Sequence, residues 1–302
     1  MKRALVGLIG ANIGKSLSPA LHEDAFEAAG MRGHYHLMEL SNGRSLLGLL
    51  NAARMTGFLG VNVTYPCKEA VLPLLDVVSA EAQEIGAVNT VTITADGEMT
   101  GYNTDRSGFR RSFEESFGRA AVEGKTALLV GAGGAGRAVA FALFDLGLKT
   151  LLVHDVDPAR ASALAGSLAH HLGNPESCRA VADPEAALVE CAGVVNATPV
   201  GMLGMPGIPV PLAAIGPSHF VADVIYTPLE TELVLAARAN GAKSMGGTGM
   251  CVYQAADAFR LFTGLEPDTA RMHRTFAAAA HLREAELAGG AASPDHTPGA
   301  SD

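Results

Sequence analysis

The chain has 302 residues, 48% of them hydrophobic, and a formal net charge of -9, which is sufficient for two domains with sizeable cores. The acidic balance and the lack of a basic stripe argue against a nucleic-acid-binding protein. The four cysteines are scattered, and no apolar run reaches the roughly 18 residues of a membrane helix. We therefore expect a cytoplasmic protein with reduced thiols, no metal site, no secretory signal and no membrane partner.

The first hundred residues alternate between strand-like and helix-like patterns. The predicted elements are strands at 5–10, 35–40, 58–63 and 88–94, and helices at 45–56, 69–75 and 80–85. Ser18 followed by Pro19 is typical of a helix N-cap with proline in the first turn. The alternation predicts an α/β layer.

A second unit begins near residue 106. An apolar strand at 126–130 runs directly into a Gly-rich turn and a helix from about 135 to 146, and further strands are predicted at 150–153, 194–198 and 220–224. Such a series of units builds a doubly wound parallel sheet. Helices at 250–262 and 269–286 then follow a glycine-rich crossover at 246–249, and the tail from 289 onward lacks periodicity and is expected to be disordered.

The Gly-rich turn contains the spacing Gly131-x-Gly133-x-x-Gly136 between the apolar strand and the helix. The first glycine permits a tight turn, the second lets the backbone approach a pyrophosphate, and the third lets the helix pack on the strand. The free N–H groups of the helix N-terminus then face the phosphates. The context favours dinucleotide binding over a purely structural glycine turn.

Asp155 follows the second strand of this unit, about 20 residues beyond Gly136. A carboxylate there hydrogen-bonds the adenosine ribose hydroxyls and repels a 2′-phosphate. Asp157 adds a second negative charge, and the nearby Arg160, which can meet a 2′-phosphate, competes with both carboxylates. The pattern favours NAD over NADP, with NADP left as the alternative.

Lys68 follows the strand at 58–63 and a proline, so it lies where α/β proteins form their clefts. A lysine that is partly desolvated exchanges protons with a hydroxyl group readily. Asp105 is suited to orient the ammonium group, and its alternative role is an Asx-turn or helix cap before Gly108. The alternative for Lys68 is an ordinary surface lysine with no catalytic role.

Other polar residues suit a small polyhydroxylated substrate. Ser16 and Ser18 are spaced so that in an extended segment their hydroxyls face the same way and grip a carboxylate, although Ser18 also fits a simple helix cap. Asn89 and Gln254 are uncharged donors that match ring hydroxyls, although each taken alone is more typical of a structural residue.

Taken together, these runs resemble the shikimate/quinate dehydrogenase family over nearly the whole chain, up to about residue 280. The matching motifs are Ser-x-Ser-Pro at 16–19, Asn-Val-Thr through Pro66 to Lys68 at 62–68, Gly-Ala-Val-Asn-Thr at 86–90, Gly-Tyr-Asn-Thr-Asp at 101–105, the glycine turn, Asn-Ala-Thr-Pro-x-Gly-Met at 196–202, Asp-x-x-Tyr-x-Pro at 223–228, and Gln-Ala at 254–255.

The resemblance implies an α/β fold of two domains, in which a Rossmann-type doubly wound parallel sheet is inserted into a substrate domain. It implies a substrate domain at 1–105, an NAD-binding domain at 106–246, returning helices at 247–287 and a disordered tail at 288–302. The implied protein is a monomer or homodimer that takes shikimate, with quinate as a further substrate.

The resemblance also implies roles for individual residues. Lys68 is implied as the acid/base with Asp105 as its partner, and Ser16 and Ser18 as the carboxylate site. Implied substrate contacts are Thr64, Lys68, Asn89, Asp105, Tyr226 and Gln254. Implied cofactor contacts are Gly131, Ala132, Gly133, Gly134, Ala135, Asp155, Thr198, Val224, Gly247 and Met250.

Family members that use NADP carry an Asn-Arg-Ser/Thr run after the second Rossmann strand, whereas this chain has His-Asp-Val-Asp at 154–157. The expectation is therefore an NAD-preferring shikimate dehydrogenase that also accepts quinate. The alternatives are an NADP-dependent biosynthetic shikimate dehydrogenase, a dehydrogenase of amino-substituted shikimate or quinate, and a ligand sensor that has lost catalysis.

Overall fold

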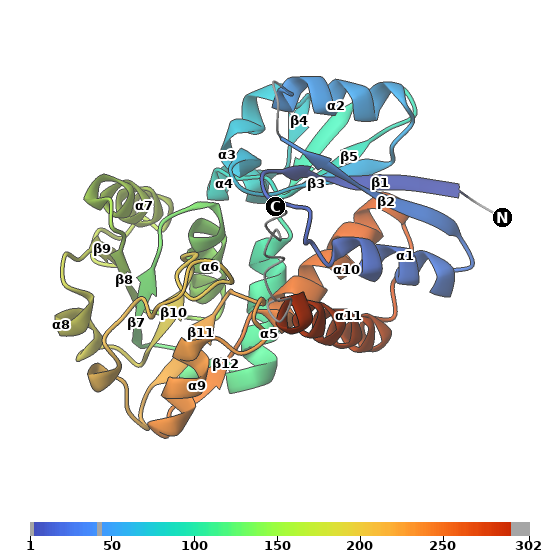
Figure 1. Ribbon diagram of the computed structural model, residues 1–302. Helices are drawn as coiled ribbons and strands as arrows, with labels where there is room; N and C mark the ends of the chain where they lie inside the picture. Colours follow the sequence, from blue (N-terminus) through green and yellow to red (C-terminus); the bar gives the residue numbers. More distant parts are fainter. Residues whose placement is uncertain (1–2, 41–43, 291–302) are drawn as a thin grey trace, which may run out of the picture.

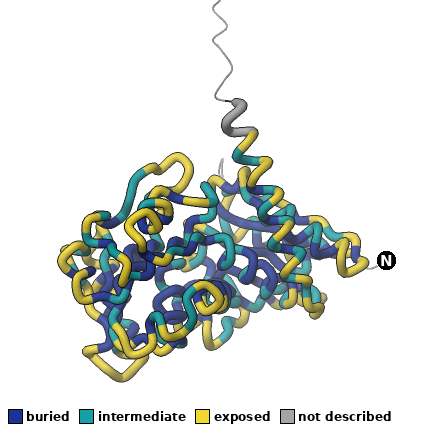
Figure 2. The backbone as a smooth tube through the Cα atoms, turned by 90° about the horizontal axis from the view of Figure 1, so that it is seen from below, coloured by how far each residue is buried: buried dark blue, intermediate teal, exposed yellow. Residues whose placement is uncertain are grey.

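The computed structural model describes residues 3–40 and 44–290, which form two six-stranded sheets with helices packed on them (Figure 1). Buried backbone runs through the centres of both lobes, and the exposed segments are mostly the outer turns and helix surfaces (Figure 2). The sequence prediction of a two-lobed α/β fold with a Rossmann-type sheet is confirmed.

The first sheet is mixed and has the strand order β2-β1-β3-β5-β6-β4. Its strands are β1 (Arg3–Gly10), β2 (Arg32–Glu39), β3 (Gly60–Val63), β4 (Val77–Val78), β5 (Thr90–Ile93) and β6 (Met99–Tyr102). β1 is parallel to β2 and β3, whereas β5 is antiparallel to both β3 and β6. The helices of this part are α1 (Ser18–Ala28), α2 (Leu46–Met55), α3 (Cys67–Ala70) and α4 (Ala80–Ile85).

The second sheet is entirely parallel and has the order β12-β11-β10-β7-β8-β9. Its strands are β7 (Thr126–Val130), β8 (Thr150–His154), β9 (Cys178–Ala180), β10 (Gly193–Asn196), β11 (Phe220–Asp223) and β12 (Lys243–Met245). Its helices are α6 (Gly134–Asp145), α7 (Pro158–His171), α8 (Pro184–Leu188) and α9 (Glu232–Ala239). The strand order reverses between β7 and β10, and ligands of doubly wound sheets bind at such a point.

Two helices, α5 (Asp105–Phe117) and α10 (Thr248–Thr263), carry the chain between the two sheets, and α11 (Thr269–Gly290) follows α10. α10 packs against α5, α11 and α1, so the C-terminal helices lie against the first sheet's layer (Figure 1). The ring of Phe259 in α10 packs in a tilted arrangement on Phe26, with the centroids 5.2 Å apart. Phe113 of α5 packs edge-on against Phe220 of the second sheet, with the centroids 5.1 Å apart. Each fully buried phenylalanine of this kind contributes roughly 1.5–3 kcal/mol relative to exposure.

The structure differs from the sequence prediction in three local places. The segment 69–75 is not one helix, because Pro73 lacks an N–H donor and the chain divides into α3 and a 3₁₀ turn at Leu72–Leu74. The strands β4, β6, β9 and β12 were not predicted. α11 continues to Gly290, and the tail expected to be disordered lies, at 291–302, outside the described residues.

Candidate active site

An ion pair joins α3 to the first turn of α5. The Nζ atom of Lys68 lies 2.5 Å from Oδ2 of Asp105, and the two side chains are only 18% and 7% exposed. Asp105 does not act as the Asx-type cap of its helix, because the Oδ1 atom of Asn103 accepts the N–H groups of Asp105 (3.1 Å) and Arg106 (3.4 Å). The Asp105 carboxylate is thereby free to hold the ammonium group.

Asn89 holds the other oxygen of the same carboxylate. Its Nδ2 atom donates to Oδ1 of Asp105 and to Oγ1 of Thr104, both at 3.0 Å. Its Oδ1 atom accepts the N–H of Thr104 at 2.8 Å and the hydroxyl of Thr90 at 3.0 Å. In this arrangement both amide hydrogens of Asn89 are engaged by the protein, so the residue orients Asp105 directly.

The two serines lie together at the start of α1. The Ser16 hydroxyl donates to the Ser18 hydroxyl at 3.1 Å, and the N–H of Ser18 donates to Oγ of Ser16 at 3.2 Å. The prediction of an extended segment with Ser18 as the cap is wrong, because Leu17 has helical angles and the helix begins at Ser18 itself. The hydroxyls still converge, since the turn through Leu17 brings them within hydrogen-bonding distance.

Tyr226, which follows β11, and Cys251, in α10, come from the C-terminal part of the chain and lie near the ion pair. Burial raises the pKa of the Tyr226 phenol above its ordinary range, and the Cys251 and Asp105 side chains act in the same direction. Burial and the charge of Asp105 raise the pKa of the Cys251 thiol to about 12, with Gln254 and Lys68 acting against them. The Asp105 carboxylate therefore raises the pKa of both residues.

Thr64 and Gln254 complete the set of expected substrate contacts. Thr64 follows β3, where its N–H donates to the carbonyl of Ile9 at 2.9 Å. A methyl group added at Gly10 would lie 2.3 Å from Cγ2 of Thr64, so only glycine leaves room there. Gln254 lies on α10, and its Nε2 atom donates to the carbonyl oxygen of Cys251 at 2.9 Å.

The glycine turn has the backbone that a close phosphate approach requires. Gly131 has a φ of 103°, a left-handed conformation that favours glycine. A methyl group at Gly136 would lie 2.0 Å from the carbonyl oxygen of Gly131. α6 begins at Gly134 without an acidic residue in its first turn, so its free N–H groups and positive dipole end fit the pyrophosphate of a dinucleotide.

The glycine turn of the second sheet lies directly beside the lysine of the first. A methyl group at Gly134 would lie 3.3 Å from both Cβ and Cδ of Lys68. Arg137, one turn further along α6, donates from Nε to the carbonyl oxygen of Ile85 at 2.6 Å. The glycine turn and the Lys68–Asp105 pair therefore face each other at the junction of the two sheets.

Asp155 is held against the glycine turn. Its Oδ2 atom accepts the N–H of Ala132 at 2.7 Å, and its Oδ1 atom accepts the N–H of Asp157 at 2.9 Å. Arg160 also reaches the turn, since a methyl group at Gly133 would lie 3.4 Å from its Nη2 atom. A fixed carboxylate and a guanidinium group thus lie at the same end of β8.

Thr198 is fixed by a buried polar cluster after β10. Its hydroxyl donates to Oδ1 of Asn196 at 2.7 Å, and the Asn196 amide donates to Asp223 at 3.0 Å. The Thr231 hydroxyl also donates to Asp223 at 2.7 Å. Burial raises the pKa of the Asp223 carboxyl to about 6, with the N–H of Ile225 and the two side-chain donors acting against it.

The last expected cofactor contacts gather where β11 meets α10. Gly247 donates its N–H to the carbonyl of Ile225 at 2.9 Å, and a methyl group on it would lie 2.2 Å from the carbonyl oxygen of Val224. Met250 is buried in the first turn of α10. Val224, Gly247 and Met250 are therefore neighbours, as a single contact surface requires.

Sequence reasoning missed several residues that order the site, notably Tyr35, Asn62, Thr90, Arg106 and Arg137. The available signal was a polar residue inside an otherwise apolar strand, which applies to Asn62 and Thr90. Such a residue needs a buried hydrogen-bond partner, and that partner lies far away in the sequence.

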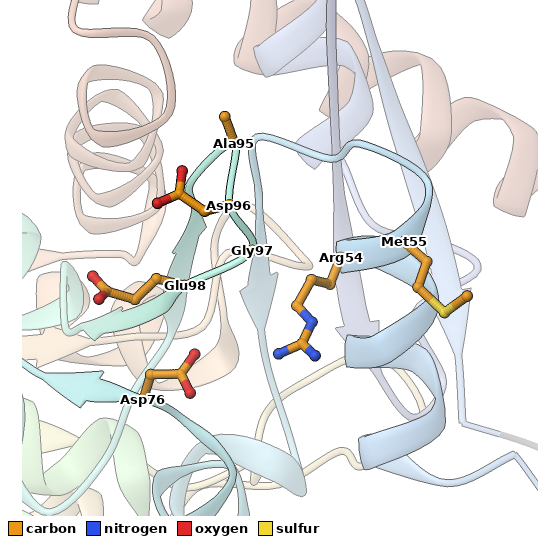
Figure 3. Close-up of a pocket in the computed structure, with 7 residues that line it drawn as sticks. All are labelled: Arg54, Met55, Asp76, Ala95, Asp96, Gly97 and Glu98. Atoms are coloured by element: carbon orange, nitrogen blue, oxygen red, sulfur yellow. The ribbon is translucent and has the colours of Figure 1, made fainter.

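A hollow at the rim of the first sheet lies apart from these residues. It is lined by Arg54, Met55, Asp76, Ala95, Asp96, Gly97 and Glu98 (Figure 3). Asp76 accepts the N–H of Met99 at 2.8 Å, and Arg54 packs beside the turn at Gly97. Among residues 3–40 and 44–290, no helix is long and apolar enough to cross a membrane, and no group of three or more His, Cys, Asp or Glu side chains is arranged to hold a metal ion.

A parallel sheet with a glycine turn at its switch point, facing a lysine–aspartate pair, defines an NAD(P)-dependent oxidoreductase. The shikimate dehydrogenase substrate binding domain model matches residues 8–91, and the shikimate 5′-dehydrogenase C-terminal domain model matches residues 247–275. The chain belongs to the shikimate/quinate dehydrogenase family.

Individual relatives differ in the cofactor that their names give. A quinate/shikimate dehydrogenase (NAD(+)) of Corynebacterium efficiens is 49% identical over 90% of this chain and 97% of its own length. A shikimate dehydrogenase (NADP(+)) of Streptomyces avermitilis is 47% identical over 89% of this chain and 93% of its own. The structure of quinate dehydrogenase from Corynebacterium glutamicum in complex with NAD has a TM-score of 0.86 at 45% identity, covering 92% of this chain and 100% of that one. The predicted family and enzyme class are confirmed.

Proposed function

We propose that this protein is an NAD-preferring shikimate dehydrogenase that also oxidises quinate to the corresponding ketone. The observation that carries the proposal is the buried Lys68–Asp105 pair, 2.5 Å apart, beside the glycine turn. A ring hydroxyl bound between the Lys68–Asp105 pair and the glycine turn lies within reach of both a proton carrier and the cofactor. The high identity to relatives named for quinate and shikimate supports this substrate class.

The bound nicotinamide supplies the hydride acceptor or donor, and the chain supplies the proton. In the direction of ketone reduction, the Lys68 ammonium group donates a proton to the developing alkoxide, and in alcohol oxidation its neutral amine accepts that proton. Asp105 holds Nζ of Lys68, while Asn89 holds Asp105, so the proton carrier is pre-positioned.

The remaining residues are assigned to binding. Ser16 and Ser18 bind the substrate carboxylate through their converging hydroxyls. Thr64, Tyr226 and Gln254 surround the ring hydroxyls, and Asn89 acts on the substrate through Asp105. The turn from Gly131 to Ala135 binds the pyrophosphate, and Thr198, Val224, Gly247 and Met250 contact the rest of the dinucleotide.

The preference for NAD rests on Asp155. Two backbone N–H groups fix its carboxylate at the turn, where it accepts ribose hydroxyls and repels a 2′-phosphate. Arg160 is the observation that favours the alternative, an NADP-dependent enzyme, because its guanidinium group reaches the same turn. Asp155→Asn removes the charge and is expected to lower the NAD-to-NADP ratio of kcat/KM by about tenfold or more, which corresponds to about 1.4 kcal/mol.

Asp157→Ser is the matched control for that variant. It also removes a carboxylate, but it keeps an oxygen to accept the N–H of Ala159 at the start of α7. Its cofactor ratio is expected to stay within about twofold of the wild type. A ratio that Asp155→Asn leaves unchanged would assign the discrimination to another residue.

The whole proposal is tested by initial rates of cofactor reduction at alkaline pH, with shikimate and quinate each combined with NAD and NADP. Turnover of shikimate with NAD supports it, and the quinate rate gives its breadth. Activity with NADP alone refutes the cofactor preference but keeps the lysine mechanism. No activity in any of the four combinations refutes the proposal, and the amino analogues are then tested as substrates. Binding without turnover would favour the function of a ligand sensor.

We further propose a cytoplasmic enzyme that acts as a monomer or homodimer. The four free cysteines, three of them buried, support a reducing compartment.

A further inference from the structure

A series of side-chain hydrogen bonds runs through the interior of the first sheet. The Tyr35 hydroxyl donates to Oδ1 of Asn62 at 2.8 Å, and Nδ2 of Asn62 donates to Oγ1 of Thr90 at 3.0 Å. The Thr90 hydroxyl then donates to Oδ1 of Asn89 at 3.0 Å. All four side chains are buried, with exposures of 2%, 7%, 0% and 3%, so water does not compete for these bonds.

The series connects the two parts of the proposed active site. At one end Tyr35 lies against α1, the helix that begins at Ser18: its ring stacks on His22 with the centroids 4.7 Å apart, and its N–H donates to Glu23 at 3.0 Å. At the other end Asn89 donates to Asp105 at 3.0 Å, and Asp105 holds Lys68. Buried hydrogen bonds therefore connect Tyr35, which packs on the helix that carries Ser18, with the acid–base pair.

Each donor in the series points in the same direction. The donors of Tyr35, Asn62, Thr90 and Asn89 each face the next residue toward Asp105. The series ends on a carboxylate, which polarises the groups before it and strengthens their bonds. Such a network in a low dielectric is rigid, because an unmade bond within it leaves a buried polar group unpaired.

We propose that Tyr35 and Thr90, acting through Asn62, are positioning residues that fix the distance between the carboxylate-binding serines and the Lys68–Asp105 pair. The proposal rests on the function proposed above. It makes the enzyme selective for rigid ring alcohols whose carboxylate and reacting hydroxyl have one fixed separation. Tyr35 acts on the serine end, and Thr90 acts on the acid–base end through Asn89.

Tyr35→Phe is the first test. The variant keeps the ring and its stacking on His22, whose centroid lies 4.7 Å away, but removes the hydroxyl that donates to Asn62. The expected result is a rise of roughly 5- to 50-fold in KM and in the dissociation constant for shikimate, with a smaller change in kcat and KM for NAD within about twofold. A general structural defect would raise the NAD constant as well, which NADH fluorescence titration measures separately.

Thr90→Val and a double-mutant cycle test the direction of the effect. Thr90→Val keeps the shape but removes the donor to Asn89, so kcat is expected to fall about tenfold or more while the shikimate constant changes less. In a Ser18→Ala background, Tyr35→Phe is expected to add less than about a twofold effect, because both substitutions act on the serine end of the site. Multiplicative effects of the two substitutions would overturn the proposal.

Tyr253→Phe is the matched control. Its hydroxyl bonds Glu115 between α10 and α5, outside the series, and kcat/KM is expected to stay within about twofold of the wild type. If the wild type oxidises shikimate and Tyr35→Phe and Thr90→Val match it, the positioning role is wrong and the proposed function stands. If the wild type binds shikimate without oxidising it, the double-mutant cycle is evaluated from the dissociation constants for shikimate. A wild type that neither binds nor oxidises shikimate or quinate overturns both proposals.

Discussion

His22 makes the stability of this protein depend on pH in a direction that is unusual for a histidine. It lies on α1, 1% exposed, between Tyr35 and Phe262, and its Nδ1 atom has no hydrogen-bond partner. Burial lowers the pKa of its imidazole from 6.5 to about 3. The folded protein therefore holds His22 neutral at pH values where the unfolded chain protonates it.

The sign and the magnitude follow from this difference. A folded pKa below the unfolded one means that stability is fully present above pH 6.5 and is lost as the pH falls toward 3. Each pH unit in this window costs about 1.4 kcal/mol, so acidification from pH 8 to pH 5 removes about 2 kcal/mol through this one residue. For a protein that is stable by about 5–15 kcal/mol, this is a considerable share.

Urea unfolding at pH 8, 6.5, 5.5 and 5 of the wild type and His22→Leu measures the effect. The substitution costs some packing at every pH, but the difference between the two proteins is expected to shrink by about 2 kcal/mol from pH 8 to pH 5. Other groups with shifted pKa values, such as Asp24 and Asp223, titrate in both proteins and cancel in the difference. His36→Leu, at an exposed position, serves as the surface control for a change from histidine to leucine. A His22→Leu difference that does not change with pH would refute the reasoning.

Three further predictions concern the site and its supports. Lys68→Met is expected to lower kcat by roughly 10²–10⁴-fold with little effect on shikimate binding, and an unchanged kcat would remove Lys68 from the chemistry. Gly136→Ala is expected to weaken NADH binding measured by fluorescence at least tenfold, because its methyl group would lie 2.0 Å from a backbone oxygen. Gly166→Ala, whose methyl group meets open space in α7, is the control and is expected to stabilise the protein by about 0.5–1 kcal/mol instead. Equal effects of the two substitutions on NADH binding would contradict the argument. Arg106→Gln removes two bonds to Asp145, at 2.6 and 2.7 Å, and is expected to lower the urea-unfolding free energy by about 1–3 kcal/mol; a loss below about 0.5 kcal/mol would show that solvent replaces the pair.

The sequence predicted those parts of the site that short motifs encode. The glycine turn follows from the spacing of three glycines after an apolar strand, and Lys68 follows from its place after β3. The prediction for Ser18 was wrong because the conformation of a single intervening residue, Leu17, decides whether the segment is extended or helical.

The internal hydrogen-bond series could not be predicted in the same way. Tyr35 and Asn62 are 27 residues apart, and Asn62 and Thr90 are 28 apart. Their contact depends on the pairing of β3 with β5 and on the place of β2, two strands away from β3. The sequence marks each residue as a buried polar group but not which partner satisfies it.

The close contact between α5 and α10 has a mechanical consequence. The chain crosses between the two sheets twice, once into α5 and once into α10, and these helices pack at small residues: a methyl group at Gly108 would lie 2.9 Å from the backbone of Gln254, and one at Gly249 would lie 2.2 Å from Oγ of Ser112. Two tethers that run side by side let the lobes bend about their common axis but resist torsion. Bending widens or narrows the space between Gly134 and Lys68, whereas torsion would move the two residues out of alignment. The paired helices therefore favour a bending motion that keeps the reacting groups aligned.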